Sequence, residues 1–469
     1  MRVRVLCRRL LLSGALAFLI PLAPKLEGQV PASSAAANTN KTYAIDLPTA
    51  LRLADAQNLD IQIARERLRE AQANQQSATE QFFPWVSPGA AYRRHVGRIQ
   101  AVDGAIFDAE KQAYAVGGTL TAQMDLGDAI YRSLAAKQLV HAADHALASQ
   151  RQDSTLAAAQ GYFDLAKARA IAEVVKEAQS ISQDYQQQLH AAVGAGIAFK
   201  GDELRVQVQT ERYQLALRQA IEQQRVAAAR LAQTLHLDSS VELVPQDADL
   251  VPLTLIEPNT ALDALVQKAL RARPELKQNQ ALVAAARDAR NGAVYGPLIP
   301  SLGAQAFGGG LGGGKNGSTG NFGDSEDYLI GLGWRIGSGG LFDAGRVNAS
   351  KARLEAARLS GEKVRDDVTR QVVESQARAQ SLFDQIAAAK QNLATASETL
   401  RLTRERKQFG VGVVLEDIQA QQELTRARSD YLNAIAEFNK AQYELTKAIG
   451  GLAESGSTGS NPKAPKSRD

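Results

Sequence analysis

The chain has 469 residues, a single cysteine, a formal net charge of +4 and a pI near 9.0. A basic pI invites a nucleic-acid partner, so the location of the charge decides what it means. Residues 1–28 alone carry the whole +4, and the rest of the chain is close to neutral. The residues that contribute are Arg2, Arg4, Arg8, Arg9 and Lys25, set against Glu27. Composition therefore excludes a nucleic-acid-binding body, and we expect no nucleic-acid partner.

The N-terminus has the layout of a secretory signal peptide. Arg2–Arg9 form a positively charged stretch, Leu10–Leu22 form an apolar stretch, and small residues follow. The apolar stretch is short for a membrane-spanning helix, although an uncleaved anchor is the alternative. We predict a signal peptide at 1–28, with cleavage between residues 28 and 37. The only cysteine, Cys7, lies inside it, so the exported chain would have no disulfide or cysteine nucleophile.

An internal duplication organises the remainder of the chain. Ala50–Ile61 aligns with Leu265–Leu276, and Leu126–Ala129 aligns with Leu341–Ala344, both at an offset of about 215 residues. The predicted divisions are a first repeat at 48–238, a proline-containing linker at 239–259, a second repeat at 260–452 and a disordered tail at 453–469.

Both repeats are dominated by helical patterns. The predicted helices are 48–81, 128–193 and 202–236 in the first repeat, and 260–294, 343–409 and 417–449 in the second. In the second repeat, apolar residues alternate at spacings of four and three, which is the pattern of a coiled coil. A helix over 343–409 would be about 100 Å long at 1.5 Å per residue. The two shorter helices, stacked end to end, would match it. We therefore expect long helical columns.

Between the helices the period changes to two. Ala113–Gln123 and Tyr328–Ile336 alternate apolar residues with small or polar ones, and Trp85–Arg94 and Leu298–Phe307 do so more weakly. Such segments are typical of membrane β-strands, and a small periplasmic sheet packed on the helices is the alternative. The predicted membrane-facing residues are Tyr114, Val116, Leu120, Ile330, Leu332, Trp334 and Ile336. The segments Gly97–Gln112 and Gly308–Asp327 are predicted surface loops.

Two strands in each repeat give four strands in each chain. Four strands cannot close a barrel, and lipid does not tolerate an open sheet edge. If these strands cross a membrane, several chains must share one barrel.

The order of these segments resembles the TolC-like outer membrane efflux family. The local markers are Pro84 and Pro297 before the strand regions, Leu341–Arg346 before the long helix, and glycine-containing turns at 193–202 and 409–417. The resemblance implies a mainly α fold with a small membrane β part. A trimeric 12-stranded β-barrel, with four strands from each chain, would continue into a long α-helical coiled-coil barrel.

The resemblance also implies a function and a location. The chain would be an outer membrane channel-tunnel, the exit duct of a tripartite efflux pump or a type I secretion system, opened at its periplasmic helical tip. It would lie in the cell outer membrane, contacting its lipid, with its helical barrel in the periplasm. Its partners would be two further copies of itself, a periplasmic adaptor (membrane fusion) protein and an inner membrane pump.

The turns between helices are the site residues that the resemblance implies. The predicted adaptor contacts are Val193, Gly194, Gly196, Val411 and Gly412. A simpler role for these glycines is the left-handed conformation at a helix C-terminus. Asp417, with Glu416, is the predicted pore constriction, and the simpler role for Asp202 and Asp417 is an N-cap.

No catalytic, cofactor-binding or metal-binding residue is predicted. Gly309–Asn316 approaches a phosphate-binding loop but lacks the hydroxyl and the following helix. His141 and His145 stand one helical turn apart without a third ligand. The alternative functions are a periplasmic coiled-coil adaptor or structural protein and, last, an exported enzyme.

Overall fold

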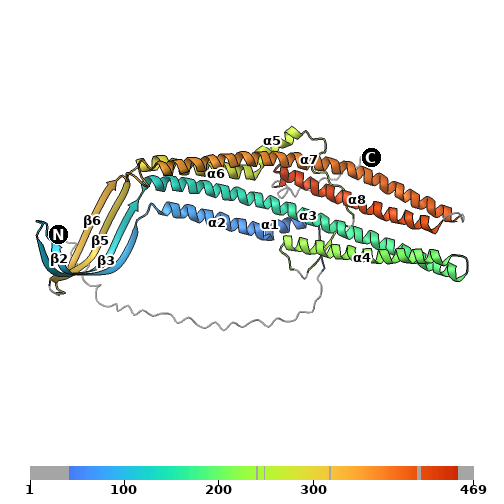
Figure 1. The fold of residues 1–469 in the computed structure, drawn as a ribbon, viewed down its shortest axis with the longest axis horizontal. Helices are drawn as coiled ribbons and strands as arrows, with labels where there is room; N and C mark the ends of the chain where they lie inside the picture. The colour runs from blue at the N-terminus through green and yellow to red at the C-terminus, as the bar shows by residue number, and fades with distance from the viewer. Residues whose placement is uncertain (1–41, 239–240, 248, 316–317, 409–412, 453–469) are drawn as a thin grey trace, which may run out of the picture. The chain divides into compact units, whose positions relative to one another are not determined.

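The computed structural model describes residues 42–452 except 239–240, 248, 316–317 and 409–412. The predicted signal peptide and tail lie outside the described residues. The described chain is mainly helical, with one four-stranded antiparallel sheet and one two-stranded parallel pair (Figure 1). This confirms the expected fold class for a single chain.

The same order of elements occurs twice. The first repeat contains α1 (Leu47–Gln57), α2 (Leu59–Glu80), β2 (Trp85–Gln100), β3 (Ile106–Met124), α3 (Leu126–Gly194) and α4 (Lys200–Thr234). The second contains α5 (Leu262–Ala272), α6 (Pro274–Tyr295), the 3-10 turn η1 (Gly296–Leu298), β5 (Ser301–Lys315), β6 (Gly323–Gly333), α7 (Ala344–Gln408) and α8 (Val414–Ala448). Two short strands, β1 (Thr42–Ile45) and β4 (Glu242–Pro245), lie before and between the repeats.

The short helices stack end to end beside the long ones, as the lengths predicted. Helix α3 has 69 residues; α1 and α2 pack along one part of it and α4 along the other (Figure 1). Asn58, between α1 and α2, donates a hydrogen bond to the carbonyl of Thr234 at the end of α4 (2.9 Å). Arg273, at the corresponding place in the second repeat, donates to the carbonyls of Lys447 and Ala448 at the end of α8 (3.4 and 3.3 Å). In each repeat, one polar side chain thus joins the short helices that are stacked end to end.

The predicted coiled-coil seam between α7 and α8 is buried. Its members with at most a tenth of their surface exposed include Ala379, Leu382, Ala396, Leu400, Ala420, Leu424, Ala427, Phe438, Ala441 and Leu445. Because so many of them are alanine, each residue of the seam buries little apolar surface. The stability of the seam therefore comes from its length.

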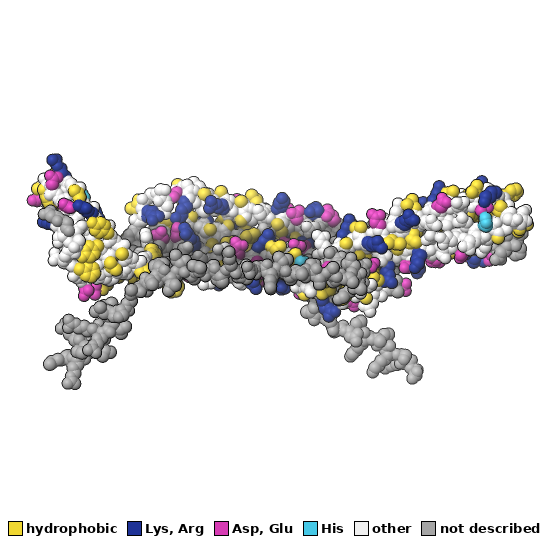
Figure 2. Space-filling model, turned by 90° about the horizontal axis from the view of Figure 1, so that it is seen from below, with side chains coloured by type: hydrophobic (Ala, Val, Ile, Leu, Met, Phe, Trp, Pro, Cys, Tyr) yellow, Lys and Arg dark blue, Asp and Glu magenta, His cyan; other side chains and the backbone are white. Residues whose placement is uncertain are grey.

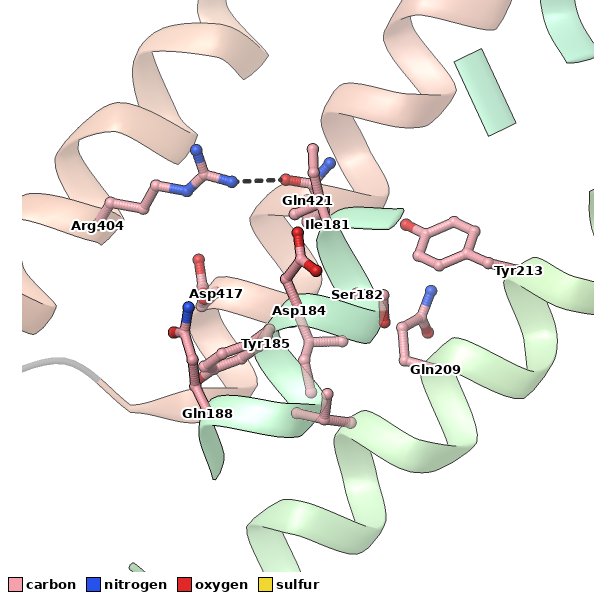
Figure 3. A pocket seen from close by; sticks show the side chains of 12 residues that line it. Ile181, Ser182, Asp184, Tyr185, Gln188, Gln209, Tyr213, Arg404, Asp417 and Gln421 are labelled. Carbon is pink, nitrogen blue, oxygen red and sulfur yellow. Dashed lines mark hydrogen bonds between the residues drawn. The ribbon is translucent and has the colours of Figure 1, made fainter. Parts of the chain in front are cut away.

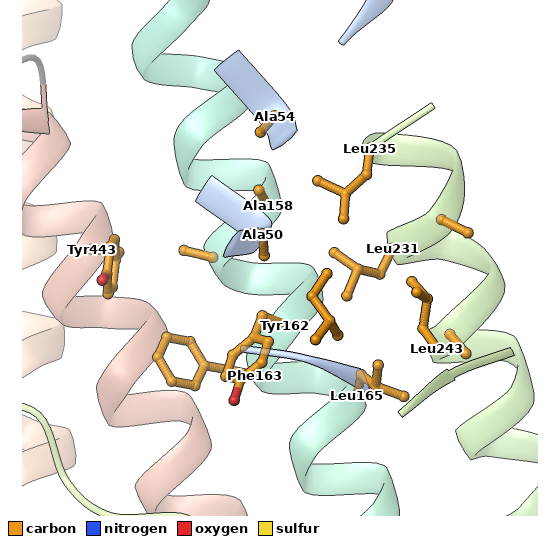
Figure 4. Packing of buried hydrophobic residues seen from close by; sticks show 14 of the residues in the cluster. Ala50, Ala54, Ala158, Tyr162, Phe163, Leu165, Leu231, Leu235, Leu243 and Tyr443 are labelled. Carbon is orange, nitrogen blue, oxygen red and sulfur yellow. The ribbon is translucent and has the colours of Figure 1, made fainter. Parts of the chain in front are cut away.

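A second core lies where β1 and β4 pair in parallel (Figure 4). Ile45 and Leu243 from these strands are fully buried with Leu165 of α3 and Leu231 and Leu235 of α4. Strands of four residues are too short to show a period of two, so the sequence predicts no element at β1 and only the linker 239–259 at β4. The segment between the repeats is therefore part of the packed structure.

The membrane-type sheet has the strand order β2-β3-β5-β6. Its strands are longer than expected, so the predicted loops Gly97–Gln112 and Gly308–Asp327 are wrong: most of their residues belong to strands. Close backbone pairing explains the glycine-rich stretch. A Cβ on Gly309 would lie 2.4 Å from the carbonyl oxygen of Val116 on β3. Only glycine fits at this approach.

The register sorts the side chains of this sheet into two faces. Directly paired residues share a face, and the pairs Leu120 with Ala306 and Ala306 with Tyr328 carry one face across three strands. We call this the apolar face; its large side chains include Val86, Tyr92, Val96, Tyr114, Val116, Leu120, Tyr328, Ile330 and Leu332. Five of the predicted membrane-facing residues lie on it, whereas Trp334 and Ile336 lie beyond the end of β6. Figure 2 shows hydrophobic side chains gathered on the sheet.

Among the described helices, none combines the length and the apolar composition needed to cross a membrane.

Candidate functional site

The turn between α3 and α4 is built around Gly196. Its φ is +75°, and its N–H donates to the carbonyl of Val193 (3.0 Å) while the N–H of Ile197 donates to that of Ala192 (3.0 Å). These two bonds are the Schellman pattern, which satisfies the last carbonyls of α3. The structural role of Gly196 is therefore established, and Gly194 still lies within the helix.

Apolar side chains project from this turn. Ile197 is 81% exposed and Phe199 is 82% exposed. Neither contributes to the core of the described chain, so both are free to meet a partner. The corresponding turn between α7 and α8 includes Val411 and Gly412, which lie outside the described residues.

Glu203 ties the two ends of this turn together. Its carboxylate, only 8% exposed, accepts a hydrogen bond from Nζ of Lys200 (2.6 Å) and lies 2.9 Å from Nδ1 of His190 on α3. Hydrogen bonds from Lys200 and then from His190 lower the pKa of Glu203 below its ordinary value. The turn therefore holds a charged carboxylate in a sheltered place.

The expectation that Asp202 and Asp417 are N-caps is wrong. The caps are Phe199 for α4 and Val413 for α8, and neither uses its side chain. The helices start at Lys200 and Val414, two and three residues earlier than predicted, so these aspartates fall in the first turn. There they interact favourably with the helix dipole.

A cavity of about 580 Å³ separates the α3–α4 hairpin from the α7–α8 hairpin (Figure 3). All four helices contribute to its lining. The residues include Ser182, Asp184 and Gln188 of α3, Gln209 and Tyr213 of α4, Arg404 of α7, and Asp417 and Gln421 of α8. Arg404 donates a hydrogen bond to the side-chain oxygen of Gln421 (3.1 Å), which links α7 to α8 across its mouth. Each of the four helices contributes polar side chains, and Ile181, Val206 and Ile418 add apolar surface.

The two carboxylates predicted at the pore have different surroundings. Asp417 is buried, with 9% of its surface exposed, and its side chain faces the cavity in Figure 3. Glu416 is 41% exposed and forms an ion pair with Arg406 of α7 (3.2 Å). In this conformation Glu416 is the more accessible of the pair.

Polar contacts bridge the two hairpins next to the cavity. Gln422 of α8 donates a hydrogen bond to Gln209 of α4. The hydroxyls of Tyr213 and Thr425 are 3.5 Å apart. Further along, Arg428 of α8 donates to Glu177 of α3 (2.8 Å). No sequence pattern predicts these pairs, because their members stand about 210–250 residues apart and each resembles an ordinary solvated helix residue.

Within the part of the chain that the structure describes, no group of three or more histidine, cysteine, aspartate or glutamate residues could hold a metal ion.

The sequence profile described as "Outer membrane efflux protein" matches residues 265–451. No curated protein matches the chain in sequence. Among solved structures, a membrane protein from Pseudomonas aeruginosa is similar with a TM-score of 0.74 and 18% identity, covering 88% of this chain and 95% of that one. The outer membrane protein VceC from Vibrio cholerae has a TM-score of 0.71 and 18% identity, covering 86% of this chain and 96% of that one. The CmeC outer membrane channel of Campylobacter jejuni has a TM-score of 0.72 and 16% identity, covering 86% of this chain and 85% of that one.

The fold is that of outer membrane channels with a periplasmic helical extension. Residues 265–451, which make up most of the second repeat, match the outer membrane efflux protein family, and the fold of the described chain is similar to that of the solved outer membrane channels. Members of this family transport compounds and are not enzymes; they form trimeric channels that work with efflux pumps.

Proposed function

We propose that three copies of this chain close one 12-stranded barrel, and that the helical ends dock a periplasmic adaptor and open to release cargo from an inner membrane pump. The observation that carries the proposal is the sheet itself. It has an apolar face, and its two outer strands, β2 and β6, each pair on one side only. Unpaired backbone groups are too costly in lipid to remain at these edges. Pairing β6 of one copy with β2 of the next removes them.

Cysteine cross-linking tests this closure. The sequence contains one cysteine, Cys7, so a Cys7→Ser background is free of competing thiols. Ala91→Cys on β2 is combined in turn with Ser325→Cys, Asp327→Cys and Leu329→Cys on β6. At least one pair should form covalent trimers on oxidation.

The matched control places the first cysteine one strand further in. Ala115 on β3 pairs directly with Ala91, so it lies at the same height but away from the edge. Ala115→Cys with the same β6 partners should give no covalent trimer. Covalent trimers from none of the Ala91 pairs would contradict barrel closure.

Adaptor docking is proposed at the two helical turns. The exposed Ile197 and Phe199, next to Val193, Gly194 and Gly196, support it, because apolar side chains outside any core mark contact surfaces. Phe199→Ser should weaken cross-linking to the adaptor and lower efflux while trimers persist. Phe83→Ser is the control, since Phe83 is 70% exposed but lies at the start of the sheet. Normal efflux by Phe199→Ser would contradict docking here.

Opening is proposed as a movement of the α7–α8 hairpin away from α3 and α4. The contacts of Gln422 and Arg428 with the other hairpin would have to break first. A Gln422→Ala, Arg428→Ala double variant should raise the conductance of reconstituted trimers several-fold, whereas Arg370→Ala, which removes an exposed ion pair within α7, should not. Unchanged conductance of the double variant would contradict this route.

The acidic residues Glu416 and Asp417 are proposed to line the constriction that this movement opens. Carboxylates around a narrow pore attract divalent cations. Glu416→Gln and Asp417→Asn should each weaken block by divalent cations in planar bilayers. Because Glu416 is the more exposed, we expect the larger effect from Glu416→Gln. Block that is unchanged in both variants would contradict an acidic constriction.

A further inference from the structure

The charges of the β-sheet are distributed unequally between its two faces. On the apolar face, at the end away from the helices, Arg94 is paired with Glu110 (2.5 Å) and Arg98 faces Asp108 (3.9 Å). Cations on this face therefore have carboxylates as neighbours. The other face, which we call the luminal face, is different.

Three basic residues stand side by side on the luminal face. His95 on β2 is paired directly with Lys111 on β3, and Lys111 is paired directly with Lys315 on β5. Arg93 lies two residues from His95 on the same face. Arg93, Lys111 and Lys315 are exposed, and within the described chain none of the three forms an ion pair.

The only carboxylate on the luminal face of the four strands, as far as they are described, is Asp327. It pairs with Phe307, eight residues along β5 from Lys315, which is about 26 Å at 3.3 Å per residue. It cannot neutralise the basic row. The other strand carboxylates, Asp108, Glu110, Asp324 and Glu326, all lie on the apolar face.

A row of like charges directly opposite one another lowers the stability of a sheet. The same strands do carry carboxylates, but these lie on the opposite face and do not offset the repulsion within the row. The row also lies 13 positions along β3 from Met124, where the strand meets α3, which is about 43 Å along the strand. This places it near the outer end of the sheet, beyond the hydrocarbon region of a tilted strand.

We propose that Arg93, Lys111 and Lys315 form a basic ring at the outer mouth of the channel, which favours the passage of anionic compounds such as carboxylates, phosphates and sulfonates. This rests on the proposed trimer, in which each chain contributes one third of the ring. A ring of one sign in a confined aqueous passage raises the local concentration of the opposite ions and lowers that of like ions.

Block by a multivalent anion tests the ring. Inositol hexakisphosphate is added to one chamber and then to the other while current is recorded through reconstituted trimers. It should block from the chamber that faces the strand loops, and less from the helical side. A Lys111→Gln, Lys315→Gln variant should need roughly ten times more of it for half-block. The block should also weaken at high salt, since exposed charges are screened.

Two further measurements sharpen the result. Arg94→Gln removes a cation at the same end of the sheet but on the apolar face, so it should leave block unchanged. Lys111→Gln relieves the like-charge pairing and should raise the heat stability of the trimer at low salt, which confirms that the variant folds. Equal block from both chambers, or block that the lysine substitutions do not change, would overturn the basic ring. An absence of any conductance would instead contradict the proposed channel, and the ring with it.

Discussion

Arg346, in the first turn of α7, forms a bidentate ion pair with the carboxylate of Asp128 in the first turn of α3. Its two terminal nitrogens donate to both carboxylate oxygens, at 2.6 and 3.3 Å, although the residues stand 218 positions apart. The same guanidinium donates to the carbonyls of Gly292 (3.0 Å) and Gly339 (3.1 Å). One side chain thus joins the starts of both long helices to the end of α6, where the sheet begins.

The marker Leu341–Arg346 gains a physical explanation from this arrangement. Asp343 accepts hydrogen bonds from the N–H groups of Arg346 (2.9 Å) and Gly339 (2.8 Å). These backbone donors lower the pKa of Asp343, so it stays charged at the start of α7. The aspartate fixes the helix start, and the arginine fixes the helix against its counterpart in the other repeat.

We predict that Arg346→Gln lowers the stability of the folded chain by about 2 kcal/mol, because it removes charge-assisted hydrogen bonds from half-buried groups. The heat stability of trimers on gels would measure this. Asp128→Asn should cost a similar amount, and the double variant should cost much less than the sum. Arg358→Gln, which removes an exposed pair with Glu355, is the control and should change little. Strictly additive losses would show that the pair is not coupled.

The α3–α4 turn offers a second prediction. Gly196→Ala forces a side chain into a left-handed conformation, so we expect a loss of about 1 kcal/mol. Gly194→Ala, two residues earlier in the helix and with open space around it, should be neutral or slightly stabilising. Hydrogen exchange of the last turn of α3 would report both. Equal protection in the two variants would contradict the role assigned to Gly196.

A pH dependence follows from Glu203. Its pKa is lowered in the folded chain from the ordinary value of 4.5, so its stabilisation is complete above pH 4.5 and is lost as pH falls through the lowered pKa. We expect the amides in the first turn of α4 to lose protection from hydrogen exchange in that acidic range and not between pH 5 and 7. Glu203→Gln should abolish this step, whereas Glu211→Gln on the exposed side of α4 should retain it. A step that persists in Glu203→Gln would assign it to another group.

The segment between the repeats provides a fourth prediction. Asn439 of α8, 1% exposed, accepts a hydrogen bond from the N–H of Leu253 (2.8 Å) and donates one to the carbonyl of Val251 (2.9 Å). Asn439→Leu should cost about 1–3 kcal/mol, because it leaves these backbone groups unsatisfied. Limited proteolysis between β4 and α5 should become faster. Asn433→Leu, at a partly exposed position of the same helix, should leave the cleavage rate unchanged, and equal rates in both variants would contradict the prediction.

The sequence predicted the long elements well and the local chemistry poorly. A heptad repeat held over many turns indicates a coiled coil strongly, and the buried seam around Leu400 and Leu424 agrees with it. The glycine-rich stretch of β5 was mistaken for a loop because glycine favours turns locally. Here, hydrogen bonds from β3 and β6 outweigh that preference.

The contacts of the candidate site could not be predicted from single residues, because they join segments that lie far apart in the sequence. Helix starts were misplaced because Asp202 and Asp417 look like caps, although Phe199 and Val413 begin the helices without a side-chain cap. The partners of Glu203 and Arg346 emerge only when the hairpins and the repeats are brought together. The face of each strand residue could have been assigned from the sequence, but only after the strand lengths were known.

All four passages between helices and strands occur at the same end of the sheet, so the loop that joins the two strands of each repeat lies at the other end. If the proposed barrel assembles in the outer membrane, each chain has to carry only two hairpin loops across the lipid, and no helix needs to follow. On the apolar face, the charges near the first loop cross as the neighbouring pairs Arg94–Glu110 and Arg98–Asp108, which lowers their cost in the hydrocarbon.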